Sequence, residues 1–130
     1  MKNYIGDFQD AYFSYATDPE LRKNAASGGS ISAILLSLLK SGAIQGALVC
    51  KHRLEHGKVT PFYCIAQDQD GLLEAQGSRY IETHFADEAL PMIQAFPGKL
   101  AVVALPCEAK QIRSYCENHP DVQQKIVCVL

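Results

Sequence analysis

Apolar residues recur along the chain with two different spacings, and together these predict alternating helices and strands. The clearest helix follows Ser30 and ends at Gly42, which is predicted to take a left-handed conformation. Its apolar positions repeat at intervals of three and four residues and form one stripe: Ile31, Ile34, Leu35, Leu38 and Leu39. Continuous apolar runs, typical of buried strands, occupy three further stretches: 47–50, 100–105 and 125–130.

Shorter patterns predict three more elements. The aromatic-rich run 11–16 predicts a strand. Asp18-Pro19-Glu20 is typical of a helix start, because it combines a capping acceptor, a proline for the first helical position and an acid near the positive end of the helix dipole. Asp70-Gly71 is predicted to open another short helix.

A hairpin is predicted in the middle of the chain. The runs 47–50 and 59–66 are expected to pair as antiparallel strands, joined by a charged, exposed turn at 51–58. Pro61 lacks a backbone N–H group, so the second strand is expected at an edge of the sheet.

The last third of the chain predicts a crossover. A helix is expected at 87–96, with Pro91 in its first turn, and a second one from Pro106 to about His119. The second helix lies between the apolar runs 100–105 and 125–130, so these form a βαβ unit that should be right-handed. The predicted fold is therefore a single three-layer α/β domain over residues 1–130, with a mixed, partly parallel sheet and this βαβ unit at its C-terminal end.

Composition narrows the functional classes. The 130 residues carry a net charge of −2, which argues against non-specific nucleic-acid binding and against a polybasic membrane anchor. The apolar stretch 31–39 is too short to span a bilayer. Five cysteines without dense spacing predict a reducing, cytoplasmic compartment, with thiols that are free or bind metal.

Ser27-Gly28-Gly29-Ser30 is the first candidate binding segment. Glycines let backbone N–H groups approach a ligand, and the helix N-terminus that follows attracts a phosphate. A plain serine cap before a core helix explains the same residues. The segment lacks both the dinucleotide-binding glycine pattern and the lysine of a P-loop.

Gly77-Ser78-Arg79-Tyr80 is the second candidate. A planar cofactor could stack on the tyrosine ring while the arginine holds its phosphate. The alternative is a surface loop in which glycine and serine serve a turn.

Cys107 is the third candidate, because it follows a predicted buried strand at the start of a helix, where parallel sheets bind ligands and where a thiolate is favoured. A small buried side chain is the alternative. Cys107 and Arg113 have the spacing of a Cys-dependent phosphatase loop, but helix-forming residues between them, among them Glu108, argue against that loop. No C-x2-C pair is present, so most ligands of any cluster at Cys107 must come from elsewhere.

The chain resembles the beta-subunit family of coenzyme F(420)-reducing hydrogenases and dehydrogenases from about Asp7 to Leu130. No single motif is decisive, and the resemblance depends on the order and spacing of six segments: 17–22, 25–29, 42–47, 75–80, 98–108 and 126–130. Family members are usually longer, so the chain is expected to be the N-terminal portion of a longer protein.

This resemblance implies a flavin- and iron–sulfur-dependent oxidoreductase that passes electrons through FAD between a cluster and a second redox partner. Ser27-Gly28-Gly29-Ser30 and Gly77-Ser78-Arg79-Tyr80 would help to hold FAD, and Cys107 would bind a 4Fe-4S cluster whose other ligands lie outside this chain. Glu108 stands where the family often has glutamine, and an acid there would weaken a site for an anionic cofactor.

The implied partners are a separate ferredoxin-like electron carrier or redox subunit and a small-molecule electron acceptor, with no nucleic acid and no membrane. A homo-oligomer stays open. Two other functions also stay open: a cofactor-free binding module derived from this fold, and a thiol-dependent enzyme that uses Cys107 as its nucleophile.

Overall fold

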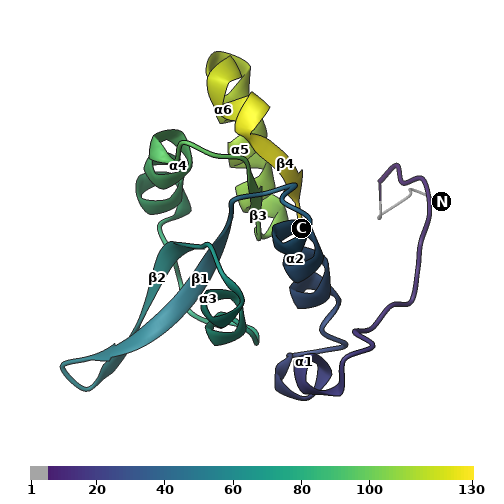
Figure 1. Ribbon diagram of the computed structural model, residues 1–130. Coiled ribbons are helices and arrows are strands. Elements are labelled where there is room, and N and C mark those ends of the chain that lie inside the picture. The colour runs from purple at the N-terminus through teal and green to yellow at the C-terminus, as the bar shows by residue number, and fades with distance from the viewer. Residues whose placement is uncertain (1–5) are drawn as a thin grey trace.

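The computed structural model of the protein describes residues 6–130 (Figure 1). Its helices and strands follow one another in this order: α1 (Pro19–Asn24), α2 (Ser30–Lys40), β1 (Gly46–Glu55), β2 (Lys58–Ala66), α3 (Gln69–Glu74), α4 (Phe85–Ala95), β3 (Leu100–Val102), α5 (Pro106–Asn118), α6 (Pro120–Lys125) and β4 (Ile126–Val129). No helix within the described residues is both long enough and apolar enough to cross a membrane.

The strands form one mixed sheet in the order β2-β1-β3-β4. β1 pairs with β2 in antiparallel register, from Ala47 opposite Ala66 to Glu55 opposite Lys58. β1 also pairs in parallel with β3, and β3 pairs in parallel with β4. The mixed, partly parallel sheet is thus confirmed, and β2, which contains Pro61, lies at an edge as predicted.

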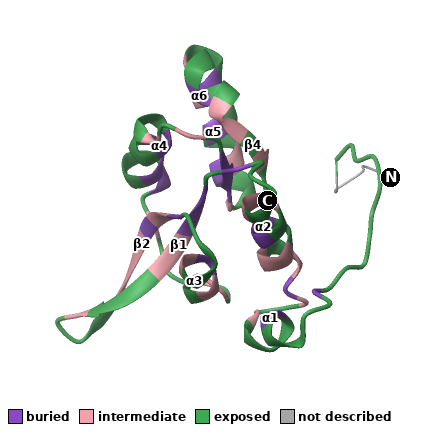
Figure 2. Ribbon diagram, viewed as in Figure 1, coloured by how far each residue is buried: buried purple, intermediate pink, exposed green. Residues whose placement is uncertain are grey.

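Helices cover both faces of this sheet, because successive strand residues point to opposite sides. Leu48 and Val102 pack with residues of α4, α5 and α6 on one face. Ala47 and Ala101 pack with residues of α1, α2 and α3 on the other face. The predicted three-layer arrangement is therefore confirmed, and Figure 2 shows the buried part of β1 at the sheet centre and the exposed part in the projecting hairpin.

The segment 11–16 is not a strand, so that prediction is wrong. It has no regular secondary structure, and the Tyr12 side chain is 83% exposed. Its last residue is buried against the body: Ala16 is 2% exposed, and its N–H group donates to the Gly28 carbonyl over 2.7 Å. Aromatic composition favoured a strand, but no neighbouring strand accepts the backbone of this segment.

The hairpin is longer than predicted. Residues 51–58 are not a turn, because β1 continues to Glu55 and β2 starts at Lys58. The connection is only two residues, His56 and Gly57, with φ angles of 50° and 75°. Positive φ at both central positions suits the right-handed twist of a tight hairpin. The sequence pattern did not indicate strands here because this arm extends beyond the core and exposes both faces, so its residues are charged and lack apolar alternation.

The α2 helix confirms the predicted element and its end, because Gly42 has a φ of 75°. Its buried face differs from the predicted stripe. Leu35 and Leu36 are buried, whereas Ile31 and Ile34 remain 46% and 44% exposed. The helix thus turns a narrower face toward the sheet than the apolar pattern alone indicates.

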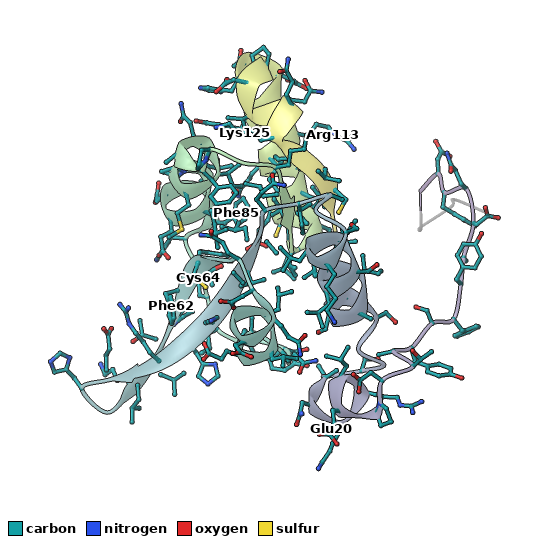
Figure 3. All side chains as sticks on the ribbon, in the orientation of Figure 1. Glu20, Phe62, Cys64, Phe85, Arg113 and Lys125 are labelled. Carbon is teal, nitrogen blue, oxygen red and sulfur yellow. The ribbon has the colours of Figure 1, made fainter. Side chains whose placement is uncertain are left out.

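The α4 helix begins earlier than predicted, so Pro91 lies in its interior instead of its first turn. The ring of Phe85, the first residue of α4 (labelled in Figure 3), lies nearly perpendicular to the ring of Tyr63 at a centroid distance of 5.5 Å. No strand follows the loop at 77–80, because residues 81–84 lead directly into α4.

The final crossover has the predicted order, but its elements are shorter. β3 ends at Val102, and a separate helix, α6, begins at Pro120 after α5 has ended. The ladder nevertheless continues, because the Leu130 N–H group donates to the Val102 carbonyl over 2.9 Å. β3 and β4 are parallel neighbours, as a βαβ unit requires. Its right-handed sense stays a prediction.

We expect Leu48→Ala to lower the free energy of unfolding by about 2–5 kcal/mol. Leu48, on β1, is fully buried in the core cluster with residues of α4 and α5, so its truncation leaves a cavity. Leu54→Ala is the matched control on the same strand: Leu54 is 73% exposed, so the loss should be about 0.5 kcal/mol or less. Urea denaturation measures both values. Equal losses in the two variants would contradict the assigned core.

Candidate functional site

The candidate segments are placed by the direction of the parallel strands. The chain leaves β3 at Val102 and enters α5 at Pro106, so Cys107 lies at the carboxyl edge of the sheet. α2 ends at Lys40 shortly before β1 begins, so its first residue, Ser30, points back toward that same edge (Figure 1). This is the edge at which open α/β sheets bind ligands.

Gly28 and Gly29 are packed against the protein's own backbone. A Cβ atom on Gly28 would come within 2.9 Å of the Ser14 carbonyl oxygen and of the Tyr15 Cβ. Gly29 has a φ of 77°, a conformation in which other residues are strained. The Ser30 and Ser14 hydroxyl groups are hydrogen-bonded at 2.8 Å. Chain packing therefore accounts for both glycines, while the first turn of α2 remains beside them.

Gln76 joins the two predicted cofactor segments, although no local motif identifies it. Its Nε2 donates to the Leu21 carbonyl over 3.0 Å and to the Ser32 hydroxyl, in the first turn of α2, over 3.1 Å. Gln76 immediately precedes Gly77, so these bonds hold the start of the Gly77–Tyr80 loop against the start of α2. The structure thus brings the two segments together.

Arg79 has an unused donor in this loop. Its Nη2 donates to the Gln76 carbonyl over 2.9 Å, and its Nη1 donates to the Ser78 carbonyl over 3.3 Å. Its Nε is buried and has no hydrogen-bond partner among the described residues. Tyr80, the next residue, is 94% exposed. A cationic donor and an open aromatic ring fit a ligand with both phosphate and planar parts, as FAD has.

Cys107 lies in the first turn of α5 and is exposed. Burial raises the pKa of the thiol at each of the other cysteines: Cys50, Cys64, Cys116 and Cys128. Within residues 6–130, no group of three or more Cys, His, Asp or Glu side chains could hold a metal ion. Cys107 can therefore supply one accessible sulfur ligand, but the described residues alone do not fit a complete iron–sulfur site.

Glu108 is turned into the protein, and the expectation that it weakens an anionic site stays a prediction. Its side chain is only 7% exposed. Oε2 accepts from the Leu105 N–H group over 2.6 Å, and Oε1 lies 2.7 Å from the Tyr63 hydroxyl. Both carboxylate oxygens are thus occupied by internal hydrogen bonds instead of being available to a ligand beside Cys107.

Cys50, on β1, lies half-buried near two charges. Burial raises the pKa of its thiol, the Arg79 guanidinium lowers that pKa, and the Glu108 carboxylate raises it. Both charges therefore act on one point of β1. This places the Gly77–Tyr80 loop and the start of α5 around the same part of the sheet.

Three comparisons relate this arrangement to known proteins. Residues 11–89, more than half of the chain, match the family model of the coenzyme F(420) hydrogenase/dehydrogenase beta subunit, N-terminal part. The chain belongs to this family. The matched residues include both segments that Gln76 joins.

Two relatives named coenzyme F(420) hydrogenase subunit beta agree with this membership. The protein from Methanothermobacter thermautotrophicus is 31% identical over 113 residues, which cover 84% of this chain and 38% of the relative. The protein from Methanosarcina barkeri is 25% identical over 127 residues, which cover 95% of this chain and 43% of the relative. The chain therefore spans about two fifths of the length of these beta subunits.

The fold of the family member is also found in a solved structure. A chain of the F(420)-reducing NiFe hydrogenase complex from Methanosarcina barkeri, solved as a xenon derivative, superimposes with a TM-score of 0.72. The match covers 88% of this chain and 40% of that chain, at 24% sequence identity. This likeness confirms the α/β fold.

Tyr63 gives the site a testable pH dependence. Burial raises the pKa of its hydroxyl above the usual 10.0; the Thr83 hydrogen bond lowers it and Glu108 raises it. The folded protein therefore holds this proton more tightly than the unfolded chain. The stability that this hydroxyl contributes is complete below about pH 10 and is lost as the pH rises toward the folded-state pKa.

We expect Tyr63→Phe to be less stable than the wild type by about 1–2 kcal/mol at pH 8, because the variant loses the hydrogen bond to Glu108. The difference should shrink above pH 10, since only the wild type has this proton to lose. Urea denaturation between pH 8 and 11 measures it. A difference that stays constant over this range would show that Tyr63 is not held protonated by its surroundings.

Proposed function

We propose that this chain is the N-terminal part of a cytoplasmic oxidoreductase that depends on FAD and on an iron–sulfur cluster. One observation carries the proposal: Gln76 holds the Gly77–Tyr80 loop against the start of α2, with the buried Arg79 Nε unpartnered in that loop among the described residues. Membership of the coenzyme F(420) hydrogenase/dehydrogenase beta-subunit family supports it.

The two segments divide the binding of FAD between them. Arg79 offers the phosphates a fixed positive charge, and the exposed Tyr80 ring offers a stacking surface. Segment 27–30 contributes through the N–H groups at the start of α2, where the helix dipole favours an anion. When FAD is bound, it supplies the exchange of electrons between one-electron and two-electron carriers.

Cys107 has a separate role in this proposal. Its exposed thiol at the start of α5 would be one ligand of a 4Fe-4S cluster, with the remaining ligands supplied from outside these 130 residues. Electrons would pass between this cluster and a second redox partner through FAD. The solved neighbour belongs to a hydrogenase complex, which supports a redox subunit or a ferredoxin-like carrier as partner and a small-molecule electron acceptor.

We expect the anaerobically purified chain to bind added FAD, measured by the quenching of flavin fluorescence and by the visible spectrum. Arg79→Gln should weaken binding about tenfold or more, because it removes a charge-assisted contact to phosphate. Arg113→Gln is the control, because Arg113 is an exposed arginine on α5 (labelled in Figure 3) and lies outside the two candidate FAD segments. It should bind FAD as tightly as the wild type.

A colourless chain that binds no FAD, both alone and within any longer reading frame that contains it, would contradict the flavin proposal and favour a cofactor-free binding module. Equal loss of affinity in both arginine variants would show that overall charge, and not the Gly77–Tyr80 loop, determines binding.

The cluster ligand is tested by anaerobic reconstitution with iron and sulfide, in the presence of the redox partner or in the longer reading frame. We expect Cys107→Ala to abolish the broad iron–sulfur absorbance. Cys128→Ala, which alters a half-buried thiol on β4, should retain it. An unchanged spectrum in Cys107→Ala would remove this residue from the cluster, and rapid selective alkylation of Cys107 in cluster-free protein would favour a thiol-dependent enzyme.

A further inference from the structure

Glu108 is the one charged side chain that is buried within the described residues. The two ion pairs found there, Lys51–Glu74 and Arg53–Glu55, do not involve it. A buried carboxylate without a cationic partner is costly unless hydrogen bonds satisfy its oxygens. The hydrogen bonds of Glu108 therefore determine whether this part of the fold is stable.

These hydrogen bonds reach three separate segments. Oε2 accepts from the backbone N–H group of Leu105 over 2.6 Å, just before α5. Oε1 lies 2.7 Å from the hydroxyl of Tyr63 on β2 and 3.4 Å from the hydroxyl of Thr83. The Tyr63 and Thr83 hydroxyls are 2.8 Å apart. The Tyr63 hydroxyl has a single proton, so it donates to Glu108 or to Thr83 at any one time, and the Thr83 hydroxyl can itself donate to the Glu108 carboxylate.

The three segments border both halves of the candidate site. Leu105 lies two residues before Cys107, and Thr83 lies three residues after Tyr80. Tyr63 supplies a fixed reference, because β2 is paired with β1 along its whole length. Glu108 thus links the start of α5 and the segment that follows the Gly77–Tyr80 loop to one point of the sheet.

We propose that Glu108 is a positioning residue that holds the Cys107 turn and the Gly77–Tyr80 loop in a fixed relation through Leu105, Tyr63 and Thr83. The functional meaning of that relation rests on the proposed function, since those two segments are the ones assigned to the cluster and to FAD. A residue that only caps α5 would need the Leu105 bond alone. The bonded pair of Tyr63 and Thr83 is what extends the link to the loop.

The test is amide hydrogen exchange of the intact chain, read residue by residue. In Glu108→Ala, we expect the Leu105 amide to exchange about tenfold faster or more, because a charge-assisted bond is lost. The amides of residues 81–84 should accelerate in the same variant. Glu108→Gln should stay within about threefold of the wild type at both places, since its amide oxygen can still accept from the Leu105 N–H group while its NH2 group donates to the Tyr63 oxygen, whose proton then goes to Thr83.

Glu117→Ala is the matched control, because Glu117 is an exposed acid on the same helix, and its exchange should equal that of the wild type. Acceleration at Leu105 with no change at 81–84 would overturn the proposal and leave Glu108 as a helix cap. If Glu108→Ala accelerates every amide through global unfolding, Thr83→Val decides: it should accelerate 81–84, and unchanged exchange there would overturn the link.

FAD binding, measured by fluorescence quenching, separates this proposal from the proposed function. If the wild type binds FAD, Glu108→Ala should bind it about tenfold more weakly or worse, while Glu108→Gln and Glu117→Ala should bind as the wild type does. Unaltered affinity in Glu108→Ala would overturn the functional meaning of the link. If the wild type binds no FAD, the proposed function fails, and the exchange pattern still decides whether Glu108 couples the two segments.

Discussion

The fold depends on the burial of β1 and β3 on both faces of the sheet. Leu48 and Val102 pack against one helical layer, and Ala47 and Ala101 pack against the other. Strands that run in the same direction cannot be joined by tight turns, so helices must carry the chain from one strand end back to the other. This constraint places the first turn of α5 at the carboxyl edge, before any functional requirement is considered, and α2, which ends shortly before β1 begins, starts at the same edge.

Polar contacts then refine what the sheet has placed. Gln76 ties the Gly77–Tyr80 loop to α1 and α2, on one face of the sheet. Glu108 ties α5 to β2, on the other face. Both side chains bridge segments that are distant in sequence, and both lie beside candidate cofactor residues. The order at this edge therefore comes from a few directed hydrogen bonds added to a non-directional core.

Sequence patterns predicted the elements that are at least partly buried. The α2 and α5 helices, the antiparallel hairpin and the parallel strands β3 and β4 follow from apolar spacing and from turn residues such as Gly42 and Pro106. The pattern failed where burial is absent. The charged arm at 51–58 was predicted to be a turn because strand pairing there leaves both faces exposed. The aromatic run 11–16 was predicted to be a strand, although no partner strand pairs with it.

The site was predictable only in part, for a related reason. The segments 27–30 and 77–80 and Cys107 have local signatures, and the structure gathers them at one edge. Gln76 and Glu108 have none, because their importance comes from their contacts with Leu21, Ser32, Tyr63 and Thr83, which lie 25 to 55 residues away from them along the chain. Single-residue chemistry identifies groups that could contact a ligand, whereas tertiary contacts identify the groups that hold them.

The packing around Gly28 and Gly29 changes how variation at these positions should be interpreted. A side chain at Gly28 would collide with the backbone of 14–15, and one at Gly29 would be strained and would crowd the Leu21 carbonyl, whether or not a cofactor is bound. Selection for folding alone would therefore retain glycine at both positions, even in descendants that had lost redox activity. Arg79, whose buried Nε has no partner of its own among the described residues, is the more informative marker of a working site across related sequences.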